Sequence, residues 1–177
     1  MFKTREIIYD QKVIYQQNKT NINISGRLIG GCIDVIRNLF STPYDGTKDF
    51  LKRYQNDNII WFFDNYALCA EDFYLTLLQM KYAGYFSNTK AIINGRTIFP
   101  SSHTNMSYYE ALTKVFDDDT IIINDADIGH TIPRMTLING AYVHIKSENK
   151  KFSINFELKW YNIIAEQKCL VADLAQR

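Results

Sequence analysis

The stretch Asn58-Ile-Ile-Trp-Phe-Phe-Asp64 decides the fold class of this chain. A short, continuous apolar run predicts a strand that is buried on both faces, as strands are in sheets covered by a layer on each side. The run ends on a carboxylate, Asp64. Because active sites of α/β proteins gather where strands end, Asp64 is the first candidate functional residue.

Strands and helices alternate on both sides of this stretch. The pattern predicts further strands at 6–16, 24–29, 90–94 and 120–124, and helices at 32–40, 47–55, 70–83 and 107–116. Strands alone follow, at 136–138, 141–147 and 152–156. This succession predicts an α/β domain with an added antiparallel layer, over residues 1–158. The remaining tail, 159–177, has the apolar spacing of an amphipathic helix, which would dock on the core or a partner, or be an extension foreign to the domain.

Composition narrows the possible partners. Hydrophobic residues make up 46% of the 177, enough for the core of one domain. The net charge of +1 lacks the excess of positive charge that is typical of proteins that bind nucleic acid. No apolar stretch approaches the roughly 20 residues that span a bilayer, and no export signal opens the chain. The cysteines form neither a metal motif nor a disulfide framework, so we expect no metal, no cofactor and a cytoplasmic location.

His130 is the second candidate, in the turn-rich segment Asp127-Ile-Gly-His-Thr-Ile-Pro133. A triad histidine accepts the nucleophile's proton on one nitrogen while a carboxylate holds the other. Gly129 would let the backbone turn sharply before such a histidine. Both residues also have ordinary interpretations: a hydrogen-bonded loop histidine, and a strand-end aspartate that forms a turn.

The third member of a triad is not evident. No serine lies in a G-x-S-x-G context: Ser25 falls inside a predicted strand, Ser41 ends a helix, and Ser101-Ser102 lies in a polar loop. Cys32 opens a predicted helix, where a thiolate is stabilised, although core packing is the favoured interpretation.

Other polar residues have a functional and a structural interpretation. Arg96 follows a turn. Its guanidinium would either bind a substrate carboxylate through two hydrogen bonds or lie on the surface. Gly30-Gly31 favours tight packing of strand and helix over anion binding, because the P-loop and dinucleotide-binding spacings are missing. His103 lies in a loop and is expected to be solvated. His144 alternates within a strand and is expected to be structural.

Five blocks of sequence occur in the order known from one enzyme family. The blocks are Gly26-Arg-Leu-Ile-Gly-Gly-Cys-Ile-Asp-Val-Ile36 with Thr42-Pro43-Tyr44, Trp61-Phe-Phe-Asp64, Leu78-Gln-Met-Lys-Tyr-Ala-Gly84, Ala91-Ile-Ile-Asn-Gly-Arg96, and Gly129-His130 with Thr136-Leu-Ile-Asn-Gly-Ala141. Together they resemble the C-terminal domain of the LD-carboxypeptidase family. These serine peptidases include the microcin C self-immunity hydrolases.

The resemblance implies a swivelling β/β/α fold and assigns His130 and Asp64 to the catalytic triad. It also implies that the nucleophilic serine belongs to an N-terminal flavodoxin-like domain that this sequence lacks. Two departures stand out. Asp64 replaces the family's glutamate, which shortens the reach by about 1.5 Å, the length of one carbon–carbon bond. Ile138 replaces the proline of the T-L-P-L-G block.

The expected function is therefore the C-terminal part of a hydrolase that cleaves an amide beside a D-amino acid, in peptidoglycan recycling. Its expected partners are a peptide or muropeptide and the missing N-terminal domain, without which the chain is expected to be inactive. Three alternatives stay open: an immunity hydrolase for peptidyl-nucleotide antibiotics, a non-catalytic binding module that self-associates as a homodimer, and a standalone enzyme that uses Cys32 or Ser101.

Overall fold

A computed structural model describes residues 6–10, 14–15, 21–148 and 151–157 of the chain. The strands are β1 (Glu6–Asp10), β2 (Ile14–Tyr15), β3 (Ile22–Cys32), β4 (Ile59–Asp64), β5 (Thr89–Gly95), β6 (Ile121–Ala126), β7 (Tyr142–Glu148) and β8 (Lys151–Glu157). The helices are α1 (Ile33–Ile36), α2 (Thr47–Arg53), α3 (Ala70–Tyr82) and α4 (Tyr108–Val115).

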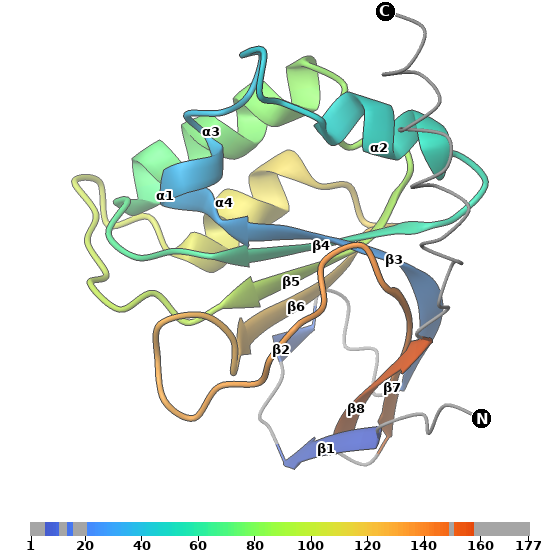
Figure 1. Ribbon diagram of the computed structural model, residues 1–177. Helices are drawn as coiled ribbons and strands as arrows, with labels where there is room; N and C mark the ends of the chain where they lie inside the picture. The colour runs from blue at the N-terminus through green and yellow to red at the C-terminus, as the bar shows by residue number, and fades with distance from the viewer. Residues whose placement is uncertain (1–5, 11–13, 16–20, 149–150, 158–177) are drawn as a thin grey trace, which may run out of the picture.

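All eight strands belong to one mixed, curled sheet in the order β1-β8-β7-β3-β4-β5-β6-β2 (Figure 1). The strands β3 to β6 are parallel. An antiparallel extension of β7, β8 and β1 continues from the outer edge of β3. The helices cover one face of the parallel part. This architecture is the α/β fold with an antiparallel addition that the sequence predicts.

Strand β4 divides the hydrophobic residues into two cores. Trp61 and Phe63 face the helix layer, where they pack with Phe73 and Leu77 of α3 and other buried residues. Ile60 faces the opposite side, in a cluster that includes Val143, Ile145, Phe152 and Ile154 of the antiparallel strands. The predicted burial of this strand on both faces is confirmed.

Two of the predicted elements are wrong. The predicted helix at 32–40 is reduced to the four residues of α1, because β3 continues through both glycines to Cys32. Val35 and Leu39, expected on a buried face, are exposed. No strand forms at 136–138, where Leu137 packs against the second core from an irregular segment.

The first predicted strand, at 6–16, corresponds to two separate strands. β1 pairs with β8, and β2 pairs with β6. β1 and β2 therefore lie at opposite ends of the sheet. One straight strand cannot pair with both β8 and β6. The tail expected at 159–177 lies outside the described residues.

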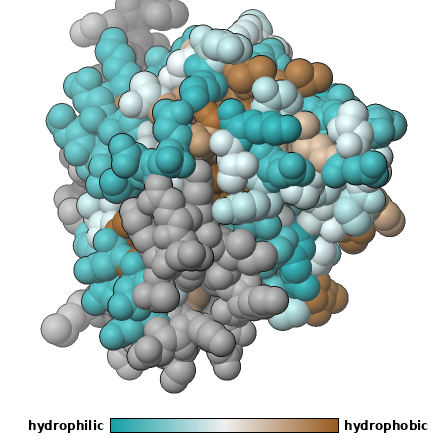
Figure 2. All heavy atoms as spheres, turned by 180° about the vertical axis from the view of Figure 1, so that it is seen from behind, coloured by the Kyte–Doolittle hydropathy of each residue, from teal (hydrophilic) through white to brown (hydrophobic). Residues whose placement is uncertain are grey.

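In the described ranges, none of the helices has the length and apolar character needed to cross a lipid bilayer. Seen from behind, the described surface mixes hydrophilic and hydrophobic areas (Figure 2).

The helix-layer core yields a direct test of stability. Leu77 on α3 is fully buried, whereas Leu75 on the same helix is 57% exposed. We expect Leu77→Ala to lower the free energy of unfolding by about 2–5 kcal/mol, because it removes buried methyl groups and leaves a cavity. Leu75→Ala is the matched control and should change it by less than about 0.5 kcal/mol. Urea unfolding of both variants measures the difference; equal effects would contradict the core assignment.

Candidate active site

The candidate site lies at the edge of the sheet where the parallel strands end. Cys32 and Asp64 are the last residues of β3 and β4, and they are direct neighbours in the strand register. Arg96 follows the end of β5, and His130 lies in the loop after β6. Parallel strands end at the same edge of a sheet, which therefore brings together residues that are far apart in the chain.

His130 and Asp64 are in direct contact. The Nδ1 atom of His130 lies 2.6 Å from Oδ2 of Asp64, and the backbone N–H of His130 donates to Oδ1 at 3.3 Å. Asp64 is 6% exposed, whereas the side chain of His130 is 44% exposed. Among the described residues, none bonds the other ring nitrogen, Nε2. One nitrogen is thus held by a buried carboxylate while the other is left to exchange a proton with another group.

Gly129 explains how the shorter carboxylate reaches the histidine. Its φ angle is +81°, and a Cβ atom built there would lie 1.9 Å from Oδ1 of Asp64. Only a residue without a side chain lets the loop approach this closely. The backbone of the His130 loop therefore comes to Asp64.

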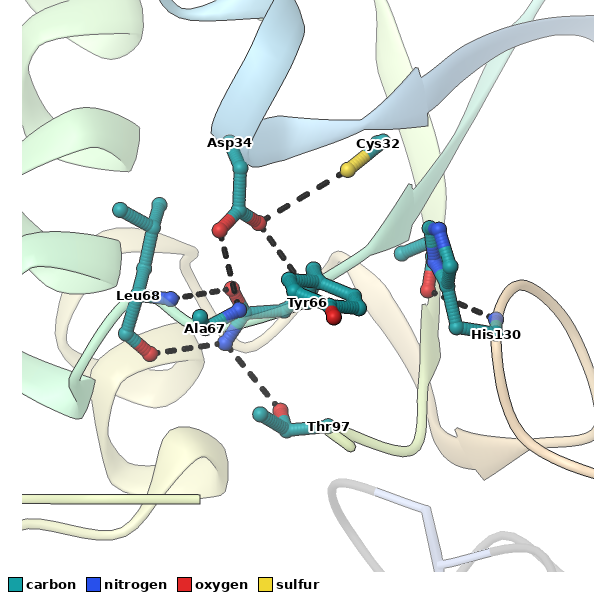
Figure 3. A network of polar contacts seen from close by, with 9 residues as sticks. Cys32, Asp34, Tyr66, Ala67, Leu68, Thr97 and His130 are labelled. Carbon is teal, nitrogen blue, oxygen red and sulfur yellow. Dashed lines mark hydrogen bonds and ion pairs between the residues drawn. The ribbon is translucent and has the colours of Figure 1, made fainter. Parts of the chain in front are cut away.

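Tyr66 borders the histidine on one side. The two rings meet edge to face with centroids 5.0 Å apart. The turn that carries Tyr66 is held by Asp34 of α1, whose carboxylate accepts from the backbone N–H groups of Tyr66 at 2.8 Å and Ala67 at 3.0 Å (Figure 3). Neither Tyr66 nor Asp34 could be named as a candidate from the sequence, because no local motif links them to His130.

Arg96 has two partners inside the protein. Its guanidinium lies 2.6 Å from Oδ1 of Asp127 and donates to the carbonyl of Pro133 at 3.1 Å. These two residues bound the segment that carries His130. Arg96 thus ties the ends of that segment to β5, and its role in substrate binding stays a prediction.

Cys32 lies beside the pair, not inside a helix-packed core. It is only partly buried, and its Sγ atom donates to Oδ2 of Asp34 over 3.8 Å. Burial, and then the charges of Asp34 and Asp64, raise the pKa of the Cys32 thiol. A nucleophilic cysteine needs electropositive surroundings, so these surroundings disfavour a standalone cysteine enzyme.

Two other positions singled out in the sequence, His144 and Gly30, have structural contacts. His144 links Ser25 and Glu157 across neighbouring strands, with both contacts at 2.6 Å. The side chain of His103 is exposed. A Cβ atom at Gly30 would lie 1.8 Å from the carbonyl oxygen of Phe62. The contacts of His144 and Gly30 fit the structural interpretations that the sequence favours, and the exposed side chain of His103 fits the expected solvation.

Comparison with known proteins identifies the relatives of this domain. The family model for the LD-carboxypeptidase C-terminal domain matches residues 25–145. Among curated proteins, the microcin C7 self-immunity protein MccF of Escherichia coli is 28% identical over 133 residues. That match covers 74% of this chain and 37% of the relative.

Solved structures show the same fold. Muramoyltetrapeptide carboxypeptidase from Oxalobacter formigenes matches with a TM-score of 0.65 and 16% identity, over 88% of this chain and 50% of that structure. MccF in complex with aspartyl sulfamoyl adenosine matches with a TM-score of 0.64 and 22% identity, over 82% of this chain and 41% of that structure. The chain thus spans half or less of the length of these relatives.

The close approach of Gly129 to Asp64 can be tested with a matched pair of glycines. Gly84, at the end of α3, has nearly the same φ angle, +82°, but a Cβ atom there would meet nothing within 4 Å. Both alanine substitutions incur the cost of a left-handed backbone, about 1–2 kcal/mol. We expect Gly129→Ala to cost roughly 1–3 kcal/mol more, because its methyl group collides with the carboxylate.

Urea unfolding measures this difference, and the NMR signals of His130 should shift in Gly129→Ala and not in Gly84→Ala. Equal stability of the two variants would show that the loop does not need to approach Asp64.

Proposed function

We propose that this chain, which belongs to the LD-carboxypeptidase family, supplies the histidine and the carboxylate of a Ser-His-acid hydrolase. The 2.6 Å contact between Nδ1 of His130 and the buried carboxylate of Asp64 carries the proposal. A carboxylate in this position fixes the tautomer of the histidine and stabilises the imidazolium that forms during the reaction.

In the proposed mechanism, Nε2 of His130 takes the proton from a serine hydroxyl as the serine attacks the carbonyl of the substrate amide. The histidine then gives this proton to the leaving amine. Water hydrolyses the acyl-enzyme by the same proton transfers in reverse. Asp64 stays ionised throughout and orients the ring.

The serine is proposed to come from a second domain. The relatives are at least twice as long as the part of them that this chain matches. Exposed apolar side chains extend from His130: Tyr66, 41% exposed, contacts its ring, Phe99, 56% exposed, contacts Tyr66, and Ile132, 86% exposed, is two residues further along the chain. An exposed apolar rim around a polar pair is typical of a surface that another protein body covers. The rim equally supports the alternative of a self-associating module, which sedimentation of the chain would detect.

The proposed substrate is a muropeptide with an amide beside a D-amino acid. The match to a muramoyltetrapeptide carboxypeptidase supports this choice. The second candidate is a peptidyl-nucleotide antibiotic, which the 28% identity to MccF favours. The free thiols of Cys32 and Cys69 support the proposal of a cytoplasmic location.

Activity of the chain joined to the proposed serine-bearing domain tests the proposal. We expect His130→Ala to lower kcat by several orders of magnitude, because the reaction loses its base. Asp64→Asn should cost about 10⁴-fold, the typical loss when an amide replaces a triad carboxylate. The readouts are release of D-alanine from a muramoyl tetrapeptide and cleavage of an aminoacyl sulfamoyl adenosine.

His103→Ala is the matched control, because His103 is an exposed loop histidine. Near-wild-type activity of His130→Ala would reject the triad. Turnover of either substrate by the isolated 177-residue chain would reject the need for a second domain.

The role of Arg96 is tested by separating kcat from KM. Because Arg96 holds both ends of the His130 segment, we expect Arg96→Gln to lower kcat by up to about 10²-fold, the cost of moving a catalytic group by about 1 Å, with little change in KM. Arg134→Gln is the control, because Arg134 is exposed directly after this segment. A raised KM with unchanged kcat would assign Arg96 to substrate binding instead.

A further inference from the structure

Three side chains with different donor atoms converge at the candidate active site. The Sγ atom of Cys32, a carboxylate oxygen of Asp64 and a ring nitrogen of His130 all lie within 4.8 Å of one another. They come from the end of β3, the end of β4 and the loop after β6. Their spacing in the sequence forms no metal motif, so only the fold brings them together.

This set of donors matches the ligands that zinc prefers. Zn²⁺ binds thiolate, imidazole and carboxylate at about 2.0–2.3 Å, which places the ligand atoms of a tetrahedral site roughly 3.5 Å apart. To reach this geometry, the 2.6 Å contact between Asp64 and His130 has to widen by about 1 Å, and the distances to Cys32, at most 4.8 Å, have to shorten by about 1 Å. The half-exposed ring of His130 has room to move, and three protein ligands leave a fourth position open.

The local charge also favours a cation. The carboxylate of Asp34 accepts from the thiol of Cys32 over 3.8 Å, and Asp64 is the direct neighbour of Cys32 in the strand register. Negative charge that opposes a thiolate attracts a divalent ion, and the bound ion in turn deprotonates the thiol.

We propose that Cys32, Asp64 and His130 form a binding site for a soft divalent cation of the zinc class. Asp34 lies next to the site and is not one of its ligands. It accepts from the thiol of Cys32 and from the backbone of Tyr66, so it positions the cysteine without being a ligand.

The site has one consequence that rests on the proposed function. A His130 ring that coordinates a cation, while Asp64 does the same, is no longer free to carry a proton to and from a serine. Metal binding and hydrolysis then exclude each other, and the cation acts as an inhibitor of the triad.

Cobalt(II) is the probe for the test, because a cobalt–thiolate bond absorbs in the near ultraviolet. The background protein is the 177-residue chain with Cys69→Ser and Cys169→Ser, so that Cys32 is its only thiol. We expect one Co²⁺ to bind with a thiolate band, and Zn²⁺ to displace it. Adding Cys32→Ser should abolish the band and weaken zinc binding by at least the 10- to 100-fold that loss of an outer-shell partner costs.

His130→Ala should weaken zinc binding to a similar extent, and His103→Ala should leave it unchanged. A background protein without the band, or a Cys32→Ser variant that binds zinc as tightly as the background, would overturn the proposal. Circular dichroism checks folding, and Cys32→Ala serves as a second variant if the serine variant unfolds.

Metal binding is measured without substrate, and the proposed function is measured by hydrolysis without metal. Failure to bind zinc would reject the metal site but not the triad. Failure to hydrolyse the substrates would reject the triad but not the metal site.

Discussion

Strand β4 has to bury both of its faces, and the two cores are built around this requirement. The side chains of Trp61 and Phe63 need the helix layer, and Ile60 on the other face needs the antiparallel strands. A sheet covered on only one side would leave large apolar side chains in water, at a cost of about 1.5–3 kcal/mol for each. The curled extension formed by β7, β8 and β1 therefore covers the face of β4 that the helices do not cover.

The same strand delivers a carboxylate to the edge of the sheet. Asp64 is almost completely buried, and a buried charge is stable only with partners that compensate for the lost water. In the part of the chain that the structure describes, the hydrogen-bonding partners of its carboxylate both belong to His130, namely the backbone nitrogen and the ring nitrogen Nδ1. The loop after β6 is thus needed to stabilise Asp64, while Asp64 orients the histidine. Arg96 holds both ends of this loop, and Gly129 allows the loop to approach the carboxylate of Asp64.

Local patterns predicted much of the fold, because apolar periodicity reports which faces are buried. The apolar run ending at Asp64 and the helix α3 followed from such patterns. The pairing of β1 and β2 with opposite ends of the sheet did not, since partner choice is a long-range property. At the site, the candidates Asp64 and His130 could be named from the sequence and their contact could only be expected. The positions of Cys32, Asp34 and Tyr66 beside them depend on how strand ends align, which no local pattern encodes.

The long strand β3 has a consequence for synthesis of the protein. One edge of β3 pairs with β4, which follows soon in the chain, but the other edge pairs with β7, as in the contact between Ser25 and His144, 119 positions apart. Ribosomes add about 5–20 residues per second, so this edge stays unpaired for on the order of ten seconds. An open strand edge is a template for pairing with other chains. The nascent protein is therefore most exposed to aggregation in this interval, after the parallel strands have been made and before β7 emerges.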